Sequence, residues 1–256
     1  MINYSGNKIT LRSIICIVLI INISCNNSNP KKDKIVSKEG MIFIPGGNFE
    51  MGGDNDEARQ DEYPKHVVTI SSFWMDESEV TNAEFKNFVD ETGYITTAER
   101  KIDWQEIKKI LPPNTPKPHD SLLSPASLVF KETSVSNLND YSKWWSLIRN
   151  ANWRQPFGPG SNIDDKENYP VVHISWEDAN EYCKWSGKRL PTEAEFEYAS
   201  RGGKINNIYS WGNEKVDIGQ LKANIWEGEF PTKNNINDKF YYCLLYTSDA
   251  ADDIPR

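Results

Sequence analysis

The sequence has few cysteines, few histidines and no excess of positive charge. Its 256 residues include four cysteines, three histidines, and 29 basic side chains against 37 acidic ones, so the formal net charge is −8. A surface that binds nucleic acid needs concentrated Lys and Arg, because these side chains displace the counterions of the phosphate backbone. The charge balance therefore argues against nucleic acid as a partner.

The three histidines do not form a recognisable metal-binding motif. His66, His119 and His173 are scattered along the chain, and none has the spacing of a zinc ligand set. His173 lies just before Ser175, an expected helix start, and we expect it to be a packed or hydrogen-bonded core residue. Nothing repeats at a fixed period, which excludes solenoid and propeller folds.

The N-terminal apolar run is too short to cross a membrane. It extends from Ile14 to Ile23, about ten residues, whereas a bilayer core of about 30 Å needs about 20. Lys8 and Arg12 precede the run, as in the positive region of a signal peptide. It ends at Cys25 after a small residue, which resembles a bacterial lipobox. We predict a lipoprotein signal peptide over residues 1–24 and lipidation of Cys25; an ordinary secretory signal with an incidental cysteine is the alternative.

The residues after this signal predict a membrane-anchored, exported protein. Residues 25–39 are polar and contain Pro30 and several lysines, which is typical of a flexible tether. Several acyl chains on Cys25 would hold the protein stably at a membrane. We therefore expect a bacterial lipoprotein on the periplasmic or outer-membrane side.

The C-terminal residues do not read as part of the fold. Cys243 to Asp253 resemble the in-frame translation of a transposase-based sequencing-library adapter. Because an adapter is not encoded by the gene, we interpret residues 243–256 as an artefact that is not part of the fold. The folded domain is then expected to cover residues 40–242.

If residues 1–24 are a signal peptide and residues 243–256 an artefact, the folded domain contains one cysteine. Cys16 leaves with the signal, Cys25 carries the lipid and Cys243 belongs to the C-terminal artefact. Cys183 therefore has no partner for an internal disulfide in this chain. In an oxidising compartment this suggests that a partner is missing.

Hydrophobic patterns predict short strands and three helices. Residues 41–45 and 49–52 are expected to pair as a hairpin across a turn at Gly46-Gly47-Asn48, and residues 66–75 form another strand. Helices are expected to start where Ser or Thr precedes an acid by three residues, which is the capping-box pattern. These starts are Thr81, Ser175 and Thr192, with ends at Gly93, Gly187 and Gly202-Gly203, and apolar positions at Phe85, Phe88, Val89, Ala179, Tyr182, Cys183, Phe196 and Ala199.

The stretch from Ile102 to Tyr169 has little periodicity. It is rich in Pro, Ser and Asn, and so long a loop in a compact domain is usually functional or disordered. Its many aromatic residues argue against disorder. The chain as a whole therefore predicts an α+β fold, rich in loops, with short strands and a few capped helices.

These motifs resemble the formylglycine-generating enzyme and sulfatase-modifying family along nearly the whole core. The matching residues are Met41 to Gly47, Phe49 to Gly52, Phe73 to Asp76, Glu79 to Asn82 and, most specifically, His173 to Trp176, Gly187 to Glu195 and Arg201 to Gly203. By resemblance, the fold is a C-type-lectin-like variant, the formylglycine-generating enzyme fold. Broad membership does not fix activity, because one fold hosts unrelated roles.

Two segments favour a true generating enzyme. One is a central insert with Ser127 to Phe130, Trp144-Trp145 and Asn152-Trp153-Arg154; the other runs from Asn224 to Pro231. The resemblance implies an oxidoreductase that uses O2 to convert the cysteine of a Cys-x-Pro-x-Arg sulfatase motif to Cα-formylglycine. The alternative is a non-enzymatic surface or gliding-motility-type lipoprotein that uses the same fold for binding.

The resemblance also implies two metals. Copper(I) would be held by two thiolates in a C-terminal segment that this chain lacks, so no catalytic residue is assigned here; soft sulfur ligands select Cu(I). A structural calcium site would use Asn224, Ile225, Asp238 and Phe240, since Ca2+ takes oxygen ligands. In the family, the cysteine at the position of Cys183 often pairs with a C-terminal cysteine. From the residues alone, Asn224 and Asp238 read instead as turn formers, because four residues do not fill the six to eight positions of calcium.

Overall fold

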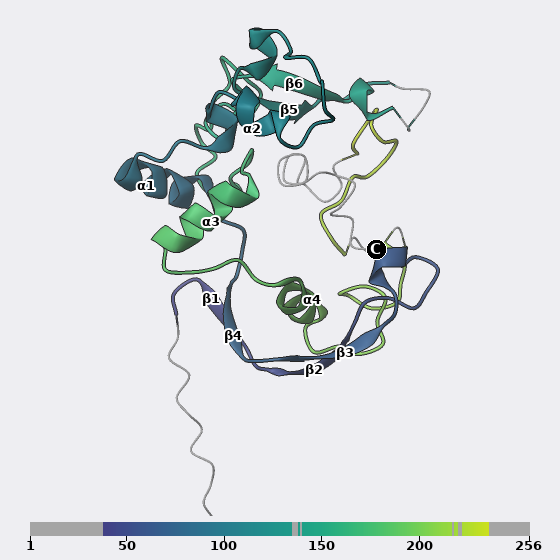
Figure 1. Cartoon of the computed structure of the whole chain (residues 1–256). Coiled ribbons are helices and arrows are strands. Elements are labelled where there is room, and N and C mark those ends of the chain that lie inside the picture. Colours follow the sequence, from purple (N-terminus) through teal and green to yellow (C-terminus); the bar gives the residue numbers. More distant parts are fainter. Residues whose placement is uncertain (1–37, 135–137, 139, 217, 220–221, 236–256) are drawn as a thin grey trace, which may run out of the picture. The chain divides into compact units, whose positions relative to one another are not determined.

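The computed structural model describes residues 38–134, 138, 140–216, 218–219 and 222–235, all within the unit Ser37–Arg256 (Figure 1). The predicted signal peptide, Cys25, Asp238, Phe240 and residues 243–256 lie outside the described residues. Of the helices in the described part, none is long and apolar enough to cross a membrane.

Two antiparallel strand pairs form one interrupted ribbon (Figure 1). β1 (Met41–Ile44) pairs with β4 (Phe73–Asp76), and β2 (Gly47–Met51) pairs with β3 (His66–Ile70). The register is the same on both sides of the break, because Ile44 lies opposite Phe73 and Gly47 lies opposite Ile70. The ribbon is therefore a single long hairpin whose connection is residues 52–65.

The predicted hairpin between residues 41–45 and 49–52 is wrong. The chain continues in the same direction through Gly46 and Gly47, and both runs pair with residues 66–76. Gly46 is needed for another reason, because a Cβ there would lie 2.6 Å from the carbonyl oxygen of Ile70. This glycine allows the opposite strand to approach closely at the break, which is a known use of glycine within strands.

Helices α1 (Asn82–Thr92) and α3 (Trp176–Trp185) hold the main core. Both begin as predicted, with complete capping boxes at Thr81 and Ser175. The buried cluster consists of Phe85, Phe88, Val89, Trp153 and Tyr182. Phe85 is 1% exposed, and its ring centroid lies 5.3 Å from those of Phe88 and Trp153. The predicted apolar face of α1 is therefore confirmed.

The end of the middle segment, residues 93–169, is hydrogen-bonded to the N-terminus of α1. The amide N–H of Asn82 donates to the carbonyl oxygen of Tyr169, and that of Val171 donates to the carbonyl oxygen of Val80, both at 2.9 Å. The first amides of a helix have no acceptor within the helix, so the carbonyl of Tyr169 supplies one for Asn82. Residues 93–169 thus leave α1 at its C-terminus and come back to its N-terminus.

Helix α4 (Glu193–Arg201) lies over the ribbon (Figure 1). It begins with the predicted capping box at Thr192 and ends at Gly202 in the left-handed conformation. The hydroxyl of Tyr198 donates to the carbonyl oxygen of Pro45 at 3.0 Å, which joins the helix to the break in the ribbon. Phe196, in contrast, is 57% exposed.

The middle segment contains a hairpin that the sequence pattern does not predict. β5 (Ala126–Phe130) and β6 (Trp145–Arg149) pair antiparallel, after the short helix α2 (Trp104–Lys108). The 3₁₀ helices are η1 (Gln60–Glu62), η2 (Thr97–Glu99), η3 (Asp120–Leu123) and η4 (Tyr141–Lys143). Short strands, capped helices and many loops confirm the α+β prediction; the C-type-lectin-like arrangement stays a prediction.

Candidate functional site

The β5–β6 hairpin is covered at one end by the loop that contains Asn224. Five aromatic side chains make this contact, and we call them the aromatic cluster: Phe130, Trp144, Trp145, Trp226 and Phe230. The ring of Trp226 lies 5.4 Å from that of Phe130 and 5.3 Å from that of Phe230. Phe230 in turn lies 5.5 Å from Trp144. Aromatic pairs at such distances add stability beyond the area they bury. The two segments that the resemblance singled out therefore pack on each other.

Hydrogen bonds fix the loop from Asn224 to Asn235 on the hairpin. The amide of Thr133 donates to the carbonyl oxygen of Pro231 at 3.1 Å, and the amide of Asn234 donates to Oε1 of Glu132 at 3.2 Å. Within the loop, the amide of Glu227 donates to Oδ1 of Asn234 at 3.1 Å. The loop thus closes on itself and on the end of β5, so its position does not depend on aromatic contacts alone.

Asn224 carries an oxygen that suits a cation. Its Oδ1 is buried and has no hydrogen-bond partner in the described part of the chain. Leaving a buried polar atom unpaired costs about 1–3 kcal/mol, so native structures normally satisfy it with protein, water or an ion. The adjacent Ile225 offers a carbonyl oxygen from the same loop. Asn224 and Ile225 therefore fit the predicted calcium site, whereas Asp238 and Phe240 lie outside the described residues.

Cys183 lies on α3 as a free, half-buried thiol. Burial and then the carboxylate of Asp76 raise the pKa of this thiol, while Lys188 opposes them. Such a thiol is poorly activated as a nucleophile, because the thiolate is the reactive form. An open pocket of about 1440 Å³ lies beside α4 and β4, and Cys183 and Ser200 both line it. The disulfide suggested for Cys183 stays a prediction.

Lys188 and Arg189 are both engaged in ion pairs, but with different elements. Arg189 pairs with Glu195 in the first turn of α4, at 2.6 Å, and this bond lowers the pKa of Glu195 to about 2. Lys188 pairs instead with Asp76 of β4, also at 2.6 Å. The residues between α3 and α4 are thereby joined to the ribbon.

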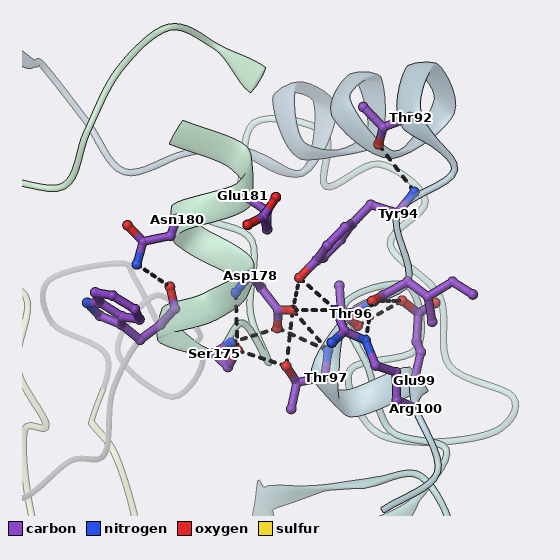
Figure 2. Close-up of polar contacts among 12 residues, drawn as sticks. Thr92, Tyr94, Thr96, Thr97, Glu99, Arg100, Ser175, Asp178, Asn180 and Glu181 are labelled. Atoms are coloured by element: carbon purple, nitrogen blue, oxygen red, sulfur yellow. Dashed lines mark hydrogen bonds and ion pairs between the residues drawn. The ribbon is translucent and has the colours of Figure 1, made fainter. Parts of the chain in front are cut away.

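A buried polar network around Asp178 connects α3 to the start of the middle segment (Figure 2). Asp178 is fully buried. It accepts hydrogen bonds from the Tyr94 hydroxyl at 2.9 Å, from the Thr97 amide at 3.0 Å and from the Ser175 amide at 2.9 Å. Burial, and then the bond to Asp178, raise the pKa of Tyr94. The sequence identifies Asp178 as a capping acid, but it does not reveal the contacts to residues more than 80 positions away.

His173 is a hydrogen-bonded interior residue, as predicted. Its Nε2 lies 2.8 Å from the carbonyl oxygen of Pro156, and burial lowers the pKa of the imidazole. Its φ of 58° is in the left-handed region, which is uncommon for a residue other than glycine. In the described residues, no group of three His, Cys, Asp and Glu side chains could hold a metal ion. His173 therefore serves to position the loop before α3.

Comparisons with known proteins agree with the motifs. Residues 26–245 match the family model of the sulfatase-modifying factor enzyme 1-like domain. A formylglycine-generating enzyme of Mus musculus is 43% identical over 201 residues, covering 78% of this chain and 50% of that protein. One of Mycobacterium tuberculosis is 40% identical over 196 residues, covering 76% and 62%. A bovine protein (Bos taurus) named inactive C-alpha-formylglycine-generating enzyme 2 is 39% identical over 208 residues, covering 78% and 60%.

The chain therefore spans between half and two thirds of the length of these relatives. Among solved structures, that of PvdO from Pseudomonas aeruginosa matches with a TM-score of 0.37 and 23% identity, covering 70% of this chain and 52% of that one.

Proposed function

Because this chain belongs to the family of the sulfatase-modifying factor enzyme 1-like domain, we propose that it is part of a formylglycine-generating enzyme. The whole protein would oxidise the cysteine of a Cys-x-Pro-x-Arg sulfatase motif to Cα-formylglycine with O2. The observation that carries the proposal is the 40–43% identity to enzymes of that name over most of the chain. The packing of the insert hairpin on the Asn224 loop adds support, because the two segments typical of generating enzymes form one folded unit.

Copper(I) would supply the oxygen chemistry, but the described residues do not fit it. They include one cysteine, Cys183, whose pKa is raised, whereas two thiolates are needed to select Cu(I). By resemblance, those thiolates belong to a segment C-terminal to Tyr242. Accordingly, no described residue is proposed as catalytic, and this chain by itself is expected to be inactive.

The function is tested by expressing the complete gene and supplying copper, O2 and a Cys-x-Pro-x-Arg peptide. We expect the peptide cysteine to be converted to formylglycine, which mass spectrometry and aldehyde labelling detect. The matched control is a peptide with serine in place of the cysteine, which should not change. An intact cysteine after incubation with copper-loaded, folded protein would exclude the oxidase.

A binding protein without catalysis is the second candidate. The observation that favours it is the 39% identity to a relative named inactive, which is nearly the identity shared with the enzymes. Identity alone therefore does not separate the two roles. Binding of the same peptide by the complete protein, without oxygen consumption, would favour this candidate over the oxidase.

We further propose that the domain binds structural calcium through Asn224 and Ile225, with Asp238 and Phe240 completing the protein ligands. Calcium takes six to eight oxygens, so water would fill the remaining positions. The buried, unpartnered Oδ1 of Asn224 supports this site. We also propose the C-type-lectin-like form of the fold, which an experimental structure of the complete protein would test.

For the N-terminus we propose a lipid anchor on Cys25 and a location on the periplasmic or outer-membrane side. In a bacterial host that makes lipoproteins, radioactive palmitate should label the chain and place it in the membrane fraction. The Cys25→Ser variant should lose the label and leave that fraction, whereas Cys16→Ser should keep both. Equal labelling of Cys25→Ser and the unaltered chain would contradict the anchor and favour an ordinary secretory signal.

A further inference from the structure

One face of the β5–β6 hairpin is apolar and only partly covered. On this face Leu128 of β5 lies opposite Leu147 of β6, and the two side chains are 57% and 59% exposed. The next pair along, Phe130 and Trp145, shares the face, because side chains alternate between the two sides of a strand. The loop from Asn224 to Asn235 packs on Phe130. It therefore covers one end of the face and leaves the leucine pair open.

The opposite face of the hairpin is packed against the domain. Ile148 follows Leu147 and so lies on that other side. It approaches Gly158 so closely that a Cβ at Gly158 would lie 2.5 Å from Cγ2 of Ile148. The hairpin is thereby held with its leucines outward. Single exposed apolar side chains are common, but a pair that continues an aromatic cluster forms a patch, and such patches mark interaction sites.

A positive charge lies at the open end of this face. Arg149 is the next residue of β6 on the side of Leu147, opposite Ala126, and it is exposed. Its guanidinium forms no ion pair or hydrogen bond with the residues that the structure describes, although the chain carries a formal net charge of −8. Residues two positions apart in a strand are separated by about 7 Å. A matching ligand presents an apolar side chain and, about 7 Å along, a carboxylate.

An extended polypeptide has this spacing between alternate side chains. We propose that the face docks an extended segment of the substrate sulfatase beside its Cys-x-Pro-x-Arg motif, with an apolar side chain on Leu128 and Leu147 and an acidic one at Arg149. The motif itself is excluded from this position, because Arg149 repels its arginine. The proposal rests on the oxidase proposed above and adds a determinant of substrate choice outside the motif.

The test measures the affinity of fluorescent peptides for the complete protein. Serine replaces the motif cysteine, so that no oxidation occurs. One peptide carries Glu-x-Leu-x-Glu on both sides of the motif, which presents the spacing in either direction, and the other carries Ser-x-Ser-x-Ser. We expect the first to bind about tenfold more tightly, since burying a leucine side chain corresponds to roughly that factor. Equal affinity for the two peptides would overturn the proposal.

Variants then locate the preference on the hairpin. Changing Leu128→Ser together with Leu147→Ser should remove it. Val67→Ser is the matched control, because Val67 is a strand residue of the other hairpin and is 68% exposed, and it should keep the preference. Arg149→Glu should weaken binding of the acidic peptide about fivefold and strengthen binding of a Lys-x-Leu-x-Lys peptide. A preference that survives the leucine changes would place the docking elsewhere.

Two other occupants of the face would each contradict the proposal. If a second copy covers it, the double leucine variant converts a dimer to a monomer in size-exclusion chromatography. If another part of the complete protein covers it, the same variant lowers the melting temperature and leaves the peptide affinities unchanged. The oxidase is judged separately: binding without turnover of the cysteine peptide rejects the oxidase alone, and turnover without a preference for the flank rejects the docking face alone.

Discussion

Replacing Asp178 with alanine should destabilise the domain by on the order of 3–5 kcal/mol. The carboxylate is fully buried and accepts from the Tyr94 hydroxyl and from the amides of Thr97 and Ser175. Alanine leaves these donors unpaired in the interior, and each such group costs about 1–3 kcal/mol. The change also removes half of the capping box of α3. Urea unfolding followed by circular dichroism measures the loss.

Asp90→Ala is the matched control for this prediction. Asp90 is also a helical aspartate, but it is half exposed and pairs with Lys86 one turn away on the surface of α1. Exposed ion pairs contribute about 0–1 kcal/mol. If Asp178→Ala and Asp90→Ala unfold at the same urea concentration, the buried network does not have the stabilising role described here.

The second large effect is expected at Phe85. Phe85→Ala should cost about 3–5 kcal/mol, because truncating a buried aromatic side chain loses its transfer free energy and leaves a cavity. Phe85 is 1% exposed and contacts the rings of Phe88, Trp153 and Tyr182. Thermal unfolding monitored by tryptophan fluorescence reports this loss directly, since Trp153 is one of the neighbours.

Phe196→Ala provides the comparison for Phe85→Ala. It is the same substitution on another helix, at a side chain that is 57% exposed. Little apolar surface returns to water there, so we expect a change below about 1 kcal/mol. A loss of stability at Phe196 as large as that at Phe85 would show that the main core lies elsewhere than between α1 and α3.

Local signals in the sequence predict the three longer helices, α1, α3 and α4, but not the short α2. Thr81, Ser175 and Thr192 each begin a helix with a complete capping box, because the signal depends on residues three positions apart. Contacts between distant residues are not visible in this way. The runs before and after Gly46 look like the two strands of a hairpin, yet both pair with residues 66–76, since a strand pattern does not specify its partner.

The candidate site shows the same limit. The family motifs locate Asn224 and the insert separately, but only the structure shows Trp226 and Phe230 packed on Phe130. The unpaired state of Asn224 Oδ1 and Trp226 Nε1 likewise depends on burial in the folded chain. A side chain's type reveals what it can bond to, whereas its satisfaction depends on the neighbours that tertiary structure supplies.

The path of the middle segment has a consequence for how this domain can change during evolution. Residues 93–169 begin at the C-terminal end of α1 and end at its N-terminus. There the amide of Asn82 donates to Tyr169, and the amide of Val171 donates to Val80. The helix therefore fixes the separation of the two ends, whatever the length of chain between them. Lengthening a flexible loop within this segment changes the free energy of folding little, since each doubling of loop length adds only about 0.6 kcal/mol of closure cost. Insertions and deletions in the exposed loops of this segment, away from Thr97 and Trp153, can therefore change its surface without altering the packing of α1 on α3.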